Sequence, residues 1–215
     1  MANYIDEHLE KVKKTPGGNL CEVLGRDDGA TCSIAVVHMD KDSVGEKHYH
    51  DTITEVYVFS KGKGRIIING HVNEIRCGEW YLIEPGNVHY IETDTEMDFL
   101  CVCTPPWEKS HEFVSDEILS DREILGMSSN GVIEMLSEND GHVICKYEIY
   151  NSKGPSFWAK NYKRIYYIVS GTGKIVIDNE DFIVKPGDCY LVDKDSNEEL
   201  YADCRLEVVL VTEFS

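Results

Sequence analysis

The chain has 215 residues, with 21 lysines and arginines against 39 aspartates and glutamates, which gives a formal net charge of −18. Its 42% hydrophobic and 28% charged residues are typical of a globular protein with room for one large domain or two small ones. Such an acidic chain repels phosphate backbones and anionic lipids. We therefore expect no nucleic-acid partner and no membrane partner.

Residues 1–14 contain acidic side chains and no apolar core, unlike a secretory signal. The longest apolar runs have the length of a strand, far below that of a membrane-spanning helix. Eight cysteines are present without a CxxC pair. We therefore expect a cytoplasmic protein whose cysteines are reduced and mostly buried as small hydrophobic side chains.

In chain order, the first predicted element is an amphipathic helix over residues 4–14, because Ile5, Leu9 and Val12 recur at helical spacing before Pro16. From Cys32 onward, short β-branched and aromatic runs alternate with Gly, Asn and Asp, a texture that predicts antiparallel strands. The clearest predicted strands are Ser33–His38, Glu55–Phe59, Gly64–Ile68, Trp80–Ile83 and Met97–Cys103.

An internal repeat organises the chain. Shifting the sequence by 109 residues, without a gap from Glu55 to His89, superimposes Gly62 on Gly171 and Tyr81 on Tyr190. Between the copies, capping-box spacing and a following glycine predict a helix over residues 115–125. The repeat predicts a domain over residues 1–114, a helical linker over 115–139 and a second domain over 140–215. A β unit of this size usually protects its sheet edges by closing into a barrel or jelly roll.

Three histidines and one glutamate in the first copy suggest a metal site. On a strand, His48 and His50 share one face because side chains alternate, and Glu55 opens the next predicted strand. His89 follows a Pro-Gly turn at the head of another strand. Three imidazoles and a carboxylate converging inside a barrel suit one divalent transition metal, such as Fe, Mn, Co, Ni, Cu or Zn.

These residues carry a resemblance to a known family. The segment from Gly45 to Gly62, with ligands at His48, His50 and Glu55, resembles the first motif of the cupin superfamily, although Gly45 lies closer to His48 than the family spacing. The segment Gly78–His89 resembles the second motif. The resemblance implies an all-β bicupin, with two tandem double-stranded β-helix (jelly-roll) barrels, short flanking and linking helices, and one metal per chain.

The second copy lacks the ligands. At the same offset, the four positions carry Phe157, Ala159, Arg164 and Glu198. We therefore expect no metal of this kind in the carboxy-terminal barrel. Its predicted role is to pack against the first barrel as a pseudo-dimer partner, with a metal-free ligand cavity as the alternative. A homodimer of the chain is a further possibility that the family suggests.

Tyr57 and two cysteines are additional candidates. Tyr57 lies two residues after Glu55 on the same strand, so its phenol can face the metal and act as a catalytic proton donor, or it can be a core aromatic. Cys101 and Cys103 share one face of a strand and can supply sulfur ligands, although core packing is the favoured interpretation.

The predicted ligand set is compatible with three functions. The first hypothesis is a dioxygenase-type oxidoreductase acting on a small organic substrate. The alternatives are a non-redox isomerase, epimerase or lyase of a sugar or hydroxy-acid, similar to phosphomannose isomerase, and a non-catalytic small-molecule-binding cupin. We rank the dioxygenase first, because few basic residues are placed to hold a sugar phosphate.

Overall fold

The computed structural model describes residues 3–5, 12–15, 18–114, 125–128, 133–137, 143–154 and 162–214. These residues form antiparallel strands and two single-turn 3-10 segments, Arg26–Asp28 and Lys109–His111. In this part of the chain no helix is long and apolar enough to cross a membrane. The chain divides into two compact units, Glu10–Ser128 (unit one) and Met1–Leu9 with Ser129–Ser215 (unit two).

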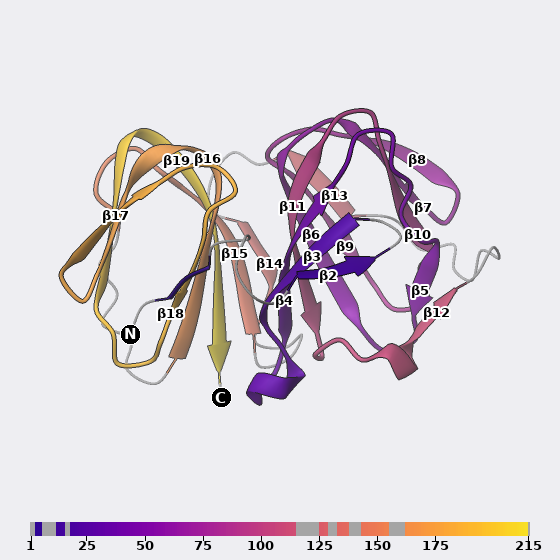
Figure 1. The fold of residues 1–215 in the computed structure, drawn as a ribbon, viewed down its shortest axis with the longest axis horizontal. Coiled ribbons are helices and arrows are strands. Elements are labelled where there is room, and N and C mark those ends of the chain that lie inside the picture. Colours follow the sequence, from indigo (N-terminus) through magenta and orange to yellow (C-terminus); the bar gives the residue numbers. More distant parts are fainter. Residues whose placement is uncertain are drawn as a thin grey trace. The chain divides into compact units, whose positions relative to one another are not determined.

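Unit one is a jelly roll of two sheets, drawn in indigo to magenta in Figure 1. All five of its clearest predicted strands are confirmed within these sheets. In order across the first sheet lie β13 (Leu125–Ser128), β9 (Glu79–Ile83), β6 (Thr54–Lys61), β11 (Met97–Thr104), β4 (Ser33–Met39), β3 (Gly18–Leu24) and β2 (Val12–Thr15). Across the second lie β12 (Glu112–Val114), β5 (His48–His50), β10 (His89–Thr93), β7 (Gly64–Ile68) and β8 (His71–Ile75).

The inner faces of the two sheets form the core of unit one. Phe59 and Phe99 come from the first sheet, while Ile66 and Ile91 come from the second, and all four side chains are buried. Burying such side chains stabilises the unit by about 1.5–3 kcal/mol each. The same interior is polar near β5 and the start of β6, where His50 and Glu55 are buried.

Unit two is also built of antiparallel strands, but here they form one continuous sheet. Its longest strands are orange and yellow in Figure 1. The sheet order is β1 (Asn3–Ile5), β18 (Cys189–Val192), β16 (Tyr162–Ile177), β19 (Glu198–Phe214), β15 (Val143–Tyr150) and β14 (Ile133–Leu136), and β17 (Glu180–Val184) also pairs with β16. Apolar side chains such as Ile168, Ile175 and Val208 fill its core.

The 109-residue repeat recurs in the backbone. Gly62 and Gly171 have φ of 100° and 90°, and Asn69 and Asp178 both have φ of 50°. A Cβ on Gly171 would lie 2.0 Å from the carbonyl oxygen of Arg205, so only glycine fits there. The all-β architecture of two tandem jelly rolls predicted from the sequence is confirmed.

Each unit gains an edge strand from a segment distant in sequence. In unit two, β1 pairs with β18, aligning Tyr4 with Tyr190. In unit one, β13 pairs with β9, aligning Gly126 with Tyr81, the repeat equivalent of Tyr190. Residues 3–5 thus lie in unit two and residues 125–128 in unit one, which differs from the division expected at residues 114 and 140.

Of the two predicted helices, the structure contradicts the first at its ends and does not describe most of the second. The helix over 4–14 is wrong at its ends, because Asn3–Ile5 and Val12–Thr15 are strands whose backbones pair with β18 and β3. Residues 6–11 lie outside the described residues. The linker helix over 115–125 also falls outside them, apart from Leu125, which begins strand β13.

Candidate metal centre

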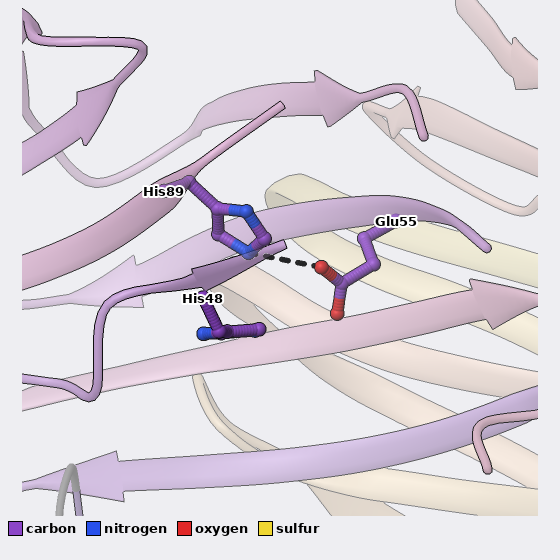
Figure 2. A group of neighbouring side chains, drawn as sticks. All are labelled: His48, Glu55 and His89. Carbon is purple, nitrogen blue, oxygen red and sulfur yellow. Dashed lines mark ion pairs between the residues drawn. The ribbon is translucent and has the colours of Figure 1, made fainter. Parts of the chain in front are cut away.

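Strand pairing brings the three histidines of unit one together. His48 and His50 lie on β5, which pairs antiparallel with β10 so that His48 is directly opposite His89. The ring centroids of His48 and His89 are 4.4 Å apart. Glu55 lies near the start of β6 on the facing sheet, and its side chain points at the imidazoles (Figure 2).

Glu55 is the centre of this cluster. Its Oε2 atom lies 2.9 Å from Nε2 of His89 and 3.3 Å from Nε2 of His50. His48, Glu55 and His89 each place a ligand atom within 4.8 Å of the others. Glu55, His50 and His89 are at most 3% exposed, and His48 is half-buried. The structure therefore brings together all four residues that the sequence predicted as ligands.

Backbone carbonyls orient all three imidazoles in the same way. The Nδ1 atoms of His48, His50 and His89 donate hydrogen bonds to the carbonyl oxygens of Glu46, His111 and Asn87, at 2.8, 3.2 and 3.0 Å. A carbonyl can only accept, so Nδ1 carries the proton and Nε2 presents a lone pair. This is the outer-shell arrangement that fixes histidine as a metal ligand.

Nε2 of His50 and Nε2 of His89 both face Oε2 of Glu55, which places acceptor atoms close together. Nε2 of His50 and Oε2 of Glu55 are buried without a hydrogen-bond partner, although they lie only 3.3 Å apart. Two acceptors at this distance repel unless a proton or a metal ion lies between them. Separations of 2.9 and 3.3 Å between Glu55 and the imidazoles match the edges of a coordination polyhedron with bonds of about 2.0–2.2 Å. The residues therefore fit a divalent metal.

The charges of the cluster set its protonation. Burial opposes ionisation of Glu55, but the neighbouring His89 and His50 outweigh it and hold the pKa of Glu55 well below its usual value. Burial, followed by the electrostatic effect of the neighbouring His89, lowers the pKa of His48 to about 4. Burial also acts to lower the pKa of His50, but the Glu55 carboxylate outweighs it, and the pKa of His50 is raised.

We expect metal affinity to fall as the pH falls through the raised pKa of His50. Below that pKa, His50 holds a proton on Nε2 that an incoming metal must displace, whereas His48 stays neutral down to about pH 4. Competition titrations with a chelator between about pH 5 and pH 8 measure this dependence. An affinity that does not change over this interval would contradict the assignment of His50 as a ligand.

The turn before His89 is held by two asparagines that the sequence analysis did not single out. The Asn69 amide donates to Oδ1 of Asn87 at 2.7 Å, and the backbone N–H of Val88 donates to Oδ1 of Asn69 at 3.0 Å. Asn87 then supplies the carbonyl that orients His89. Asn69 has a positive φ in a tight turn. In the sequence, an asparagine at this place indicates a turn but does not indicate that it supports His89.

Glu112 also lies beside the histidines. It pairs with His50 across strands β12 and β5, and it forms a second group of potential ligands with His48 and His50. Its carboxylate accepts hydrogen bonds from Nε1 of Trp107 at 2.8 Å and from Nζ of Lys109. Nothing in the local sequence indicated this residue, because its position depends on a strand pairing over more than sixty residues.

The cluster forms part of the wall of a cavity of about 240 Å³. Most of the lining is apolar, including Leu20, Val37 and Phe99. The hydroxyl of Tyr57 enters the cluster, 3.1 Å from Nε2 of His89 and 3.4 Å from Oε1 of Glu55. The cavity therefore suits a small, partly apolar molecule held next to the metal ligands.

Cys101 and Cys103 lie on the same cavity wall. Their Sγ atoms are 3.7 and 3.6 Å from Oε1 of Glu55 and 3.7 Å from each other. The favoured expectation for these residues was core packing. They do contribute to the core of unit one, but their sulfur atoms also face a carboxylate.

Unit two places an ion pair at the equivalent position. Arg164, the counterpart of Glu55, donates from Nη2 to Oε2 of Glu198 at 2.7 Å, and its Nε also contacts this carboxylate. Glu198 is the counterpart of His89. Tyr166, the counterpart of Tyr57, donates to Oε1 of Glu198 at 3.1 Å. Phe157 and Ala159 lie outside the described residues.

Two tandem jelly rolls, the first with a His-x-His pair, a glutamate and a later histidine on its inner wall, define a cupin, and the chain is a member of this superfamily. The sequence model of ectoine synthase matches residues 8–118. This match covers half of the chain and nearly all of unit one. The chain belongs to the ectoine synthase family.

Individual relatives agree with this assignment. The chain is 35% identical over 86 residues to L-ectoine synthase of Mycolicibacterium vanbaalenii, an alignment of 39% of this chain and 65% of the relative. It is 33% identical over 82 residues to L-ectoine synthase of Mycolicibacterium gilvum, over 37% of this chain and 62% of the relative. The chain thus spans slightly less than two thirds of the length of these relatives.

Solved structures match along most of the chain. Protein Ylba from E. coli superimposes with a TM-score of 0.71 at 12% identity, over 99% of this chain and 90% of its own. Salicylate 1,2-dioxygenase from Pseudaminobacter salicylatoxidans gives a TM-score of 0.67 at 11% identity, over 91% and 76% of the two chains. At such low identity these likenesses show the fold alone.

The comparisons correct the expected activity. The dioxygenase hypothesis is contradicted, because the family and its named relatives are ectoine synthases, which are lyases. The lyase alternative agrees better, although not in the form resembling phosphomannose isomerase. The error arose because three histidines and a glutamate hold redox and non-redox metals alike.

Proposed function

We propose that unit one is a metal-dependent lyase that removes water from a small organic molecule and closes a ring, the type of reaction by which an ectoine synthase would form its product. One observation carries the proposal. Three imidazoles hold Nδ1 on backbone carbonyls, and two of them, His50 and His89, turn Nε2 toward a buried carboxylate on the wall of a small cavity. The proposed metal ligands are His48, His50, Glu55 and His89.

Loss of water during ring closure sets chemical requirements that this site meets. A nucleophile of the substrate attacks a carbonyl carbon, and the carbonyl oxygen must gain protons before it leaves as water. Bound by the four ligands, a divalent metal would supply Lewis acidity toward that oxygen. The apolar cavity wall limits access of bulk water, which would otherwise favour the reverse hydrolysis.

Tyr57 is the proposed proton donor. Burial, followed by the negative charge of Glu55, raises the pKa of Tyr57 well above its usual value, so the phenol stays protonated at neutral pH. Its hydroxyl lies in the cavity within 3.4 Å of Glu55 Oε1 and 3.1 Å of His89 Nε2. A substrate oxygen bound next to the four proposed metal ligands would therefore be within reach of the Tyr57 proton.

We expect Tyr57→Phe to lower kcat by about 10²–10⁴-fold, the usual effect of losing a general acid. Metal content should stay unchanged, because the phenol is not a proposed ligand. Steady-state kinetics together with elemental analysis of the same preparation separate the two effects. A variant with wild-type kcat would show that Tyr57 is only a core aromatic.

Ectoine itself provides the test of the proposed reaction. Metal-loaded protein is incubated with the open-chain molecule that differs from ectoine by one added water, and ring closure is followed by NMR with and without oxygen. We expect equal turnover in both conditions, loss of turnover after chelation, and loss of turnover in His89→Ala. His71→Ala, an exposed histidine on β8, is the matched control and should remain active.

Two results would contradict the proposal. The first is the absence of ring closure by protein that contains its full complement of metal. The second is turnover that requires oxygen, because a lyase needs no oxidant. Turnover that survives complete metal removal would reject the metal-dependent form of the mechanism.

A further inference from the structure

The carboxylate of Glu55 faces two different groups of side chains through its two oxygens. Oε2 faces the Nε2 atoms of His50 and His89. Oε1 faces the thiols of Cys101 and Cys103 and also accepts a hydrogen bond from the Tyr57 hydroxyl. Strand pairing fixes this arrangement, because β11 lies beside β6 with Cys103 directly opposite Glu55 and Cys101 opposite Tyr57. Alternation along β11 places both thiols on the same side.

The three atoms have the spacing of a tetrahedral metal site. With bonds of about 2.3 Å to sulfur and 2.0–2.1 Å to oxygen, tetrahedral angles require about 3.75 Å between two sulfurs and about 3.5–3.6 Å between sulfur and oxygen. The structure has 3.7 Å between the sulfurs, and 3.6 and 3.7 Å from the sulfurs to Oε1. The two sulfur atoms and Oε1 of Glu55 would therefore need to move little to coordinate one ion.

We propose that Cys101, Cys103 and Oε1 of Glu55 form a second cation site, selective for thiophilic ions such as Zn²⁺ and Cd²⁺. Thiolates favour soft metals, whereas the imidazole and carboxylate set also accepts Mn²⁺ and Fe²⁺. All three residues line the cavity that His48 and His89 also line, so an ion reaches both positions by the same route. The site does not depend on the proposed lyase activity.

Occupation of this site has a definite proton balance. Each thiol loses its proton when its sulfur binds the ion, so one divalent ion releases two protons and no oxidant is involved. Glu55 contributes its existing negative charge. The three ligands then carry three negative charges, which favours a divalent ion strongly in a buried position.

The test is a titration of the reduced, full-length protein with Cd²⁺, followed by ultraviolet sulfur-to-cadmium charge-transfer absorption. We expect one ion bound through two thiolates. Cys101→Ser and Cys103→Ser should each reduce the affinity for this ion by at least about tenfold. Cys77→Ser, which changes an exposed cysteine, should leave the absorption unchanged.

A second measurement uses the wild-type protein, in case a serine variant fails to fold. Cysteines are alkylated with and without one equivalent of Cd²⁺, and the labelled peptides are identified by mass spectrometry. Selective protection of the peptide that contains both Cys101 and Cys103 supports the site. Protection of any other cysteine instead, or a charge-transfer band that survives both serine substitutions, overturns it.

Discussion

Glu55→Gln is expected to reduce the affinity of unit one for Mn²⁺ by more than about 100-fold, and lyase activity with it. Glutamine keeps the size of the side chain but removes the negative charge that faces His50 and His89 at 3.3 and 2.9 Å. Outer-shell changes alone lower metal affinity about 10–100-fold, so loss of a charged ligand should exceed this range. Chelator competition measures the affinity directly.

The same experiment has a built-in control. His71→Ala removes a histidine that is exposed on β8 and is not one of the proposed ligands, and it should bind Mn²⁺ as the wild type does. Circular dichroism checks that Glu55→Gln keeps its strands. Folded Glu55→Gln protein that binds Mn²⁺ as tightly as the His71→Ala protein would show that the carboxylate is not a ligand.

Arg164→Met is expected to destabilise unit two by about 3–5 kcal/mol, because it leaves Glu198 buried without its cation. Arg164 and Glu198 are 1% and 2% exposed, and the guanidinium also donates to the carbonyl oxygens of Tyr162 and Ser196. Burial raises the pKa of Glu198 even with the arginine beside it. Hydrogen exchange of β16 and β19 reports the loss without assuming that both units unfold together.

Two comparisons make the Arg164 result specific. Arg205→Met breaks the pair of an exposed arginine with the partly buried Glu207 on β19 and should cost no more than about 1 kcal/mol. The double variant Arg164→Met/Glu198→Leu removes both charges and should recover most of the loss. Exchange in Arg164→Met that is no faster than in Arg205→Met would contradict a stabilising ion pair at this position.

Much of the site could be predicted because its determinants are local or repeated. The pair His48 and His50 is set by strand alternation, and the Pro-Gly turn before His89 marks the start of β10. The 109-residue repeat predicted both the second barrel and the loss of ligands at Arg164 and Glu198. The structure shows in addition that these two residues bind each other.

The wrong helix prediction and the missed Glu112 have a common physical cause, which is pairing between strands distant in sequence. Ile5, Leu9 and Val12 have helical spacing, but backbone pairing of β1 with β18 and of β2 with β3 outweighs this local preference. Glu112 reaches the histidines through the pairing of β12 with β5, which local sequence does not encode. The choice between redox and non-redox chemistry failed for a different reason, since one ligand set serves both.

We expect the three imidazoles and the carboxylate of unit one to bind one divalent transition metal per chain. The most direct test is the Mn²⁺ content per chain after saturation and removal of free metal, in the wild type, His50→Ala and His71→Ala. Mn²⁺ avoids the thiol site because it prefers oxygen and nitrogen ligands. We expect one equivalent in the wild type and His71→Ala, and none in His50→Ala. Two equivalents in the wild type, or undiminished binding in His50→Ala, would rule out a single Mn²⁺ site at these residues.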